Sequence, residues 1–103
     1  MIKKNNAIST DWNDFMLEKL KDEEFAREYL NISLMEYIQN GDFKLFYKSL
    51  EDVLKARTSV RKFAQSAELD RANLCAILKG KRKPHLHTVL KILSELGYSL
   101  KVA

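Results

Sequence analysis

The sequence predicts an all-α protein, and three features of its 103 residues lead to this fold class. Glycine and proline are scarce, with three and one copies, whereas sheet proteins with many turns usually need more of both. Apolar residues recur at three- and four-residue steps, which is the spacing of one face of a helix. Residues typical of helix ends, mostly aspartate before a periodic segment and glycine after it, separate these segments.

Two helices are expected in the N-terminal part of the chain, after a tail at 1–10 that has no hydrophobic period. Asp11 is placed to cap the first helix, and Asp22, which is followed by acidic residues, is placed to cap the second. The second helix carries an apolar stripe and is expected to end near Asn40-Gly41, a strong stop signal. We therefore assign 1–41 to an N-terminal tail and helical extension.

Four further helices are expected in the second region, 42–103. Their approximate bounds are 42–57, 60–67, 71–79 and 86–96. After them, Tyr98–Val102 alternates apolar and polar residues and is expected as one short strand, which would need a partner such as a second copy of the chain.

The composition argues against several classes of protein. No apolar run approaches the roughly 18–20 residues needed to cross a bilayer, so we expect a cytoplasmic protein that does not contact a membrane. Cys75 is the only cysteine, so no internal disulfide can form and no zinc site can rest on thiolates. We recognise no catalytic constellation in the sequence, and we therefore expect a non-enzyme without metal or cofactor.

Charge is distributed unevenly along the chain. Residues 1–50 hold 7 Lys+Arg and 9 Asp+Glu, whereas 51–103 hold 11 and 5, so the two halves carry net charges of −2 and +6. An acidic first half and a basic second half suggest two surfaces with different partners. Taken alone, the basic half is compatible either with nucleic-acid binding or with a solvated, lysine-rich surface.

The segment from Ser59 to Leu86 has the pattern of a helix-turn-helix. This motif consists of two short helices that cross at a steep angle and are joined by a turn of three to four residues. The first helix needs a small residue at the crossing, which Ala64 supplies, and the turn needs an apolar plug, which Leu69 supplies. The other residues expected to face inward are Phe63, Ala67, Leu74, Ile77 and Leu78.

The outward face of the second helix of this motif has the chemistry of a DNA-reading surface. An α-helix fits the major groove of B-DNA, and residues near its N-terminus reach the base edges. Arginine can bond to guanine, asparagine can pair with adenine, and alanine permits close approach and contact with a thymine methyl. The residues expected to read bases are Arg71, Ala72, Asn73 and Ala76. Those expected to hold the DNA backbone are Arg61, Lys62, Lys79, Lys81, Arg82 and Lys83.

Ser59–Leu86 resembles the helix-turn-helix of phage repressors of the Cro/C1, or XRE, type, and the run from Thr88 to Gly97 resembles the closing helix of that family. The resemblance implies a lambda-repressor-like helical bundle. Two positions depart from the family pattern. Glu68 stands at a turn position often filled by glycine, where a left-handed backbone would cost on the order of 1 kcal/mol. Val60 stands where glutamine is common in the family. Since valine has no polar side chain, only its backbone N–H could contact a phosphate at this position.

The order of segments along the chain resembles the antidote proteins, or antitoxins, of addiction (toxin–antitoxin) modules. The resemblance rests on the acidic first helices, Asn40-Gly-Asp-Phe, Leu50-Glu-Asp-Val-Leu-Lys-Ala-Arg, the repressor motif and the terminal Gly-Tyr-Ser-Leu-Lys-Val. It implies a homodimeric repressor that binds double-stranded operator DNA at its own promoter. It also implies that the protein neutralises a RelE/ParE-like toxin, and RNA-cleaving toxins of that class tend to be basic.

Two other functions stay open from the sequence. The chain would be a stand-alone phage-type transcriptional repressor if its front helices served only the core or the dimer. It would be a protein-interaction module without a DNA role if the paired helices were scaffold. The aromatic residues of the first half are compatible with core packing or with a stripe that binds a partner protein. These residues are Trp12, Phe15, Phe25, Tyr29, Tyr37, Phe43, Phe46 and Tyr47.

Overall fold

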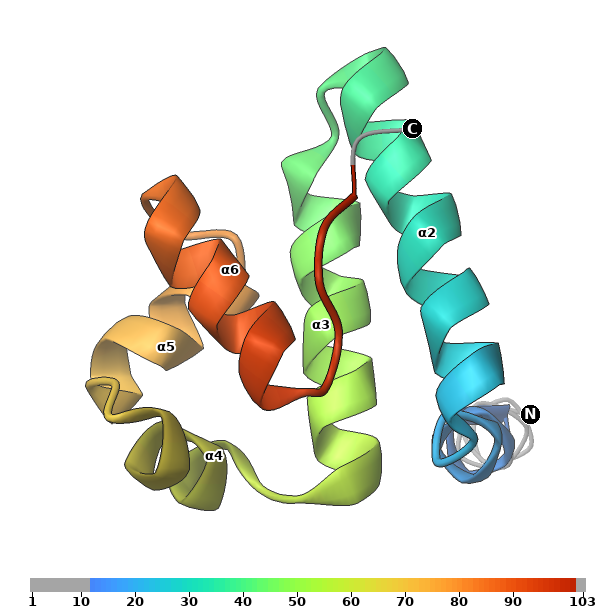
Figure 1. Ribbon diagram of the computed structural model, residues 1–103, viewed down its shortest axis with the longest axis horizontal. Helices are drawn as coiled ribbons and strands as arrows, with labels where there is room; N and C mark the ends of the chain where they lie inside the picture. The colour runs from blue at the N-terminus through green and yellow to red at the C-terminus, as the bar shows by residue number, and fades with distance from the viewer. Residues whose placement is uncertain (1–11, 102–103) are drawn as a thin grey trace, which may run out of the picture.

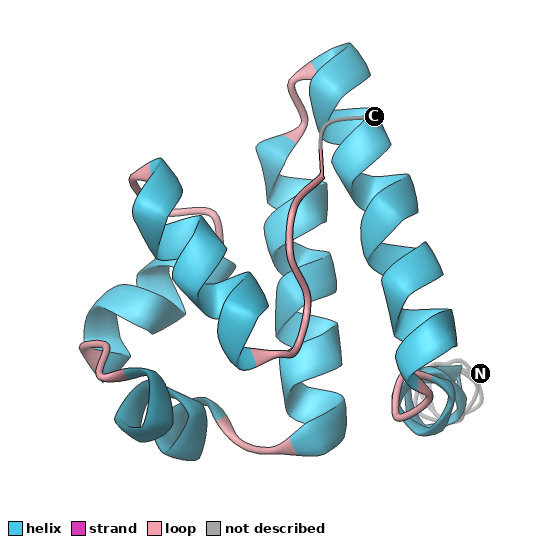
Figure 2. Ribbon diagram, in the orientation of Figure 1, coloured by secondary structure: helices cyan, strands magenta, loops and turns pink. Residues whose placement is uncertain are grey.

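Every regular element in the part of the chain that the structure describes, residues 12–101, is a helix (Figure 2). This computed structural model contains an initial helical segment at 12–19, followed by the helices that Figure 1 labels. Their bounds are α2 Glu23–Asn40, α3 Phe43–Arg57, α4 Val60–Ala67, α5 Arg71–Leu78 and α6 Leu86–Glu95. The all-α class is therefore confirmed. Within these residues, no helix combines the length and the apolar composition that a bilayer crossing requires.

Side-chain caps fix where four of the helices begin. At each of these starts, a carboxylate or hydroxyl oxygen accepts a hydrogen bond from a backbone N–H of the first turn, which the helix itself leaves unpaired. The capping residues are Asp22, Asp42, Ser59 and Asp70, and three of them are aspartates that precede a periodic segment of the sequence. Gly41 ends α2 in a left-handed conformation, with a φ of 72°. Asp11 and the tail at 1–10 lie outside the described residues.

The central helix is α3, which has α2 on one side and α4, α5 and α6 on the other (Figure 1). Its side chains Phe46, Leu50, Val53 and Leu54 are at most 2% exposed. The same buried cluster takes in Ala26 and Leu30 of α2, Leu74 and Leu78 of α5, and Ile92 and Leu93 of α6. Full burial of a side chain of this size contributes about 1.5–3 kcal/mol to the free energy of folding. Because all of these helices contribute to one buried cluster, a common core holds the acidic and the basic halves together.

The short helices α4 and α5 form a pair joined by a turn at 68–70. Across this turn the backbone N–H of Leu69 donates to the carbonyl of Ala64 at 2.8 Å, and the side chain of Leu69 packs against the core. The residues that the sequence placed inside the pair are all buried: Phe63, Ala64, Ala67, Leu74, Ile77 and Leu78. One face of α5 is thereby fixed inward, which determines the face that remains outside.

A polar clasp, made by the side chains of Arg57 and Tyr98, joins three separate parts of the chain. The Arg57 guanidinium donates one hydrogen bond to the carbonyl of Leu96 at 2.7 Å and another to the hydroxyl of Tyr98. That hydroxyl donates in turn to the carbonyl of Glu23 at 2.9 Å. The guanidinium also lies 5.2 Å from the centroid of the Tyr98 ring. The clasp therefore fastens the end of α3 to the end of α6 and to the start of α2.

The strand expected over Tyr98–Val102 does not form in residues 98–101, and Val102 lies outside the described residues. Instead, the backbone N–H of Tyr98 donates to the carbonyl of Leu93 at 2.9 Å, and the Tyr98 ring packs against the core. A strand needs a neighbour for its backbone groups, and residues 12–101 of the single chain contain no strand to pair with. The predicted strand is therefore wrong for residues 98–101.

The turn between α4 and α5 is strained at Glu68. This residue has φ 56° and ψ 45°, the left-handed conformation that costs residues other than glycine on the order of 1 kcal/mol. We expect Glu68→Gly to raise the free energy of unfolding in urea by about 1 kcal/mol. Gln65→Gly, in the helical part of α4, is the matched control and should lower that free energy by roughly 0.5–1 kcal/mol. Equal destabilisation by both substitutions would contradict the strain assigned to Glu68.

Removal of the clasp should destabilise the whole bundle. Arg57→Met keeps a long apolar stem but leaves the Leu96 carbonyl and the Tyr98 hydroxyl without their charged donor. Hydrogen bonds to charged groups contribute about 1.5–3 kcal/mol, so we expect a loss of that size in urea denaturation. Arg61→Met, at an exposed position of α4, is the control and should change stability by less than about 0.5 kcal/mol. A loss no larger than that of the control would show that the clasp is dispensable.

Candidate nucleic-acid interface

The residues expected to read bases lie together on the outward side of α5. Arg71 and Ala72 are exposed, and Asn73 and Ala76 are half-buried, whereas Leu74 between them is buried against the core. The protein's own residues therefore do not cover this face. Its small alanines leave the helix backbone open to close approach by a ligand, and Arg71 and Asn73 supply hydrogen-bonding groups.

Asn73 is bonded to a residue of the loop that follows α5, a contact that the sequence analysis did not anticipate. One guanidinium nitrogen of Arg82 donates to the Asn73 side chain at 2.7 Å. An arginine has only donors, so the atom that it meets must be the amide oxygen, and the amide NH₂ of Asn73 remains available as a donor. Arg82, expected only to hold the DNA backbone, is thereby placed beside a residue expected to read bases.

The remaining cations lie at the start of α4 and in the loop after α5. Arg61 and Lys62 are exposed in the first turn of α4, whose N-terminus is capped by the neutral hydroxyl of Ser59. Lys81 and Lys83 are exposed in the loop, and the Lys83 ammonium lies 5.2 Å from the centroid of the Phe43 ring. The structure thus brings cations to both ends of the α4–α5 pair. Val60, whose backbone N–H is expected to contact a phosphate, is the first residue of α4.

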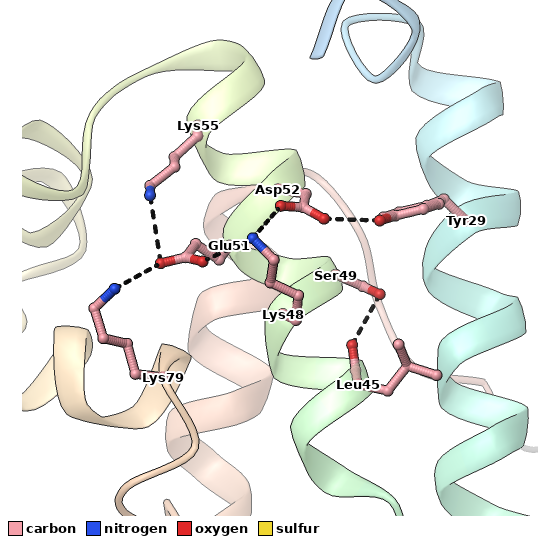
Figure 3. A network of polar contacts seen from close by, with 8 residues as sticks. All are labelled: Tyr29, Leu45, Lys48, Ser49, Glu51, Asp52, Lys55 and Lys79. Atoms are coloured by element: carbon pink, nitrogen blue, oxygen red, sulfur yellow. Dashed lines mark hydrogen bonds and ion pairs between the residues drawn. The ribbon is translucent and has the colours of Figure 1, made fainter. Parts of the chain in front are cut away.

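Lys79 takes part in a cluster around the buried carboxylate of Glu51, shown in Figure 3. The Glu51 side chain is 8% exposed, and its oxygens lie 3.4, 3.5 and 3.8 Å from the ammonium groups of three lysines. These are Lys48, Lys55 and Lys79. Burial of a carboxylate is costly unless cations or hydrogen-bond donors lie close to it, and these lysines supply that compensation. The ammonium of Lys79 therefore faces α3 in the free protein, and its expected phosphate contact stays a prediction.

The neighbouring Asp52 extends this cluster to α2 (Figure 3). One Asp52 oxygen accepts a hydrogen bond from the hydroxyl of Tyr29 at 2.7 Å, and the other lies 3.1 Å from the Lys48 ammonium. Burial, together with the hydrogen bond and the negative charge of Asp52, raises the pKa of Tyr29 to about 12. Tyr29 consequently remains a neutral donor at ordinary pH, and polar contacts link α2, α3 and the end of α5.

The basic loop also packs against Lys44 of α3, a residue that no sequence signal singled out. Gly80, in the loop, has a φ of +75°, and a Cβ added there would lie 2.9 Å from the Cγ atom of Lys44 in α3. The absence of a side chain at Gly80 thus lets the stem of Lys44 pack against the loop. Because Lys44 is 36 positions away in the sequence, its contribution of a further cation beside the loop becomes visible only in the fold.

Comparison with known proteins identifies one family. A sequence family described as "Probable addiction module antidote protein" matches residues 11–103, whereas no curated protein and no solved structure gives a match. The matched range includes all the helices from α2 to α6 and therefore both the acidic and the basic halves. An antidote protein implies a toxin as its partner. On this match over most of its length, the chain belongs to the family of probable addiction module antidote proteins.

Proposed function

We propose that this antitoxin uses the α4–α5 pair as an XRE-type helix-turn-helix, with a lambda-repressor-like arrangement, to bind double-stranded operator DNA at its own promoter. In the proposal it acts in the cytoplasm as a homodimeric repressor, neutralises a RelE/ParE-like toxin, and works by binding alone, without catalysis. The observation that carries the DNA-binding part is the uncovered face of α5, with cations at both ends of the α4–α5 pair.

The outward face of α5 suits the major groove in shape and in chemistry. A helix enters this groove with its N-terminal residues toward the base edges, which are within reach of Arg71 and Ala72 in the first turn. An arginine can bond both acceptors of a guanine, and such a bidentate contact discriminates against the wrong base by about 1–3 kcal/mol. The small side chains of Ala72 and Ala76 let the helix lie deep in the groove.

Contacts to phosphates would hold α5 in position. The N-terminus of α4 favours an anion because its first N–H groups, including that of Val60, point outward and its capping residue carries no charge. Arg61 and Lys62 add positive charge at the same end, and Lys81 and Lys83 add it beyond α5. Such contacts fix the register on DNA without reading sequence. A dimer would present two copies of this surface to half-sites about one helical turn apart.

Separate substitutions test the base-reading and phosphate-binding roles. We expect Arg71→Ala to weaken binding to a duplex of the chain's own promoter by about 1–3 kcal/mol but to leave random duplex almost unaffected. Lys81→Ala should weaken binding to both duplexes and reduce the slope of log affinity against log salt by about one. Fluorescence anisotropy over a salt series measures both effects, with Lys19→Ala, in the first helical segment, as the control. If wild type shows no preference for the promoter, or both variants match it, the placement of α5 is wrong.

The Asn73–Arg82 hydrogen bond predicts that the two residues act as a unit on DNA. Each single alanine substitution removes the same contact, so the losses in affinity should not add when both are made. We expect a coupling free energy of about 0.5–3 kcal/mol from the double-mutant cycle on the promoter duplex. The cycle of Asn73 with Arg61, on a different helix, should be additive within roughly 0.5 kcal/mol. Additivity in both cycles would mean that the bond is lost when DNA binds.

A further inference from the structure

One face of α2 carries large apolar side chains that the described part of the chain leaves exposed. Most surface helices bury their apolar stripe, and α2 does so with Ala26 and Leu30. A second set of apolar side chains lies on the other side of the same helix, with exposed fractions from 37% to 69%. This set, called the outer face of α2 below, consists of Phe25, Ile32, Met35 and Ile38. At about 100° per residue, the four lie within a sector of roughly 140° that excludes the buried residues.

The outer face of α2 also carries acidic residues. Glu24 and Glu28 are exposed and fall in the same sector of the helix, and the whole of α2 carries four glutamates against one arginine. The arginine is Arg27, whose guanidinium is already paired with Glu24 at 2.7 Å. The surface therefore combines four exposed apolar side chains with two negatively charged ones.

A hollow continues this surface toward the C-terminal segment. It measures about 460 Å³, and its lining includes Leu34 and Leu100 together with the cations Arg27 and Lys101. Leu34 lies one helical turn from Ile38, so the hollow opens beside the outer face. A partner that lies along α2 could place a side chain in this hollow, as protein interfaces do at their best-packed positions.

The charges select among the possible occupants of this face. Nucleic acid is repelled by Glu24 and Glu28, and α5 lies on the far side of α3 (Figure 1). A second copy of the chain joined through the same face with the two α2 helices antiparallel is an outcome that sedimentation tests; with the helices parallel, Glu24 and Glu28 would lie against their own counterparts, because a two-fold interface uses one patch twice. Like charges in contact cost several kcal/mol. The occupant that fits is a protein with an apolar cleft and basic margins.

We propose that the outer face of α2 is the surface on which this antitoxin docks its toxin, and that the toxin offers an apolar cleft edged by lysine or arginine. The inference rests on the proposed toxin-neutralising function and adds the place and chemistry of the contact. Apolar anchors supply the affinity of such an interface, and Glu24 and Glu28 increase the rate of association with a basic partner. The docking surface is separate from the α4–α5 pair.

The experiment uses the full chain and, as the probe, the purified product of the reading frame beside its gene. Affinity and association rate are measured by surface plasmon resonance at two salt concentrations. We expect the double variant Ile32→Ser/Met35→Ser to lose about thirty-fold or more in affinity, the size typical of central anchors. Glu28→Lys should slow association several-fold, and this effect should shrink at high salt. Both variants should unfold in urea like wild type and bind the promoter duplex unchanged.

Matched controls separate this surface from exposed residues elsewhere. Leu86→Ser changes a leucine of α6 that is 67% exposed, and Glu95→Lys reverses a charge on the same helix. Neither should alter binding of the neighbouring gene product.

Each failure has its own signature. If wild type does not bind that product, the toxin-neutralising function fails and this inference fails with it. If wild type binds and the α2 variants bind equally well, the function stands and the docking surface is wrong. If sedimentation shows that Ile32→Ser/Met35→Ser converts a dimer to a monomer, the face joins two copies of this chain, and the proposal is overturned.

Discussion

The structure depends on the burial of α3 on two sides. Helices of eight residues such as α4 and α5 do not persist alone in water, because the first turn of a helix is costly to form and few hydrogen bonds follow it. They persist here because Leu74 and Leu78 share a buried cluster with Leu50 and Leu54 of α3. α2 packs against the same helix, so the proposed DNA-binding and toxin-binding surfaces are built on a common core. A change in the buried residues of α3 therefore affects both surfaces.

Polar side chains of α3 help to fix the orientation of the helices that pack against it. Apolar burial favours contact but sets angles loosely, whereas a buried carboxylate needs partners at defined places. Glu51 meets Lys79 at the end of α5, Asp52 meets Tyr29 of α2, and Arg57 meets the segment after α6. These contacts join α3 to the elements on both of its sides. The orientation of α5 thus depends in part on side chains of α3 that have no role in the proposed DNA contacts.

Local features were predictable from the sequence, and features that join distant residues were not. Asp22, Asp70 and Gly41 mark helix ends through contacts with residues at most four positions away, so their roles follow from sequence alone. The costly conformation of Glu68 was also indicated, because a turn of this kind usually takes glycine. The contacts of Arg57 with Tyr98, and of Lys79 with Glu51, span tens of residues and leave no periodic signal. The expected strand after Gly97 failed for the same reason, because alternation does not reveal whether a pairing partner exists.

The carboxylate of Asp70, which starts α5 by accepting the N–H of Asn73 at 2.8 Å, has a consequence for how a duplex could approach. The N-terminus of a helix ordinarily attracts an anion, but at α5 the negative charge of Asp70 already offsets that attraction. A phosphate that came in along the axis would meet repulsion, whereas the tip of α4, closed by the uncharged Ser59, presents no such obstacle. In the proposed DNA complex, the sugar–phosphate chain would therefore be steered onto the end of α4 and away from that of α5, and α5 would offer its side to the bases.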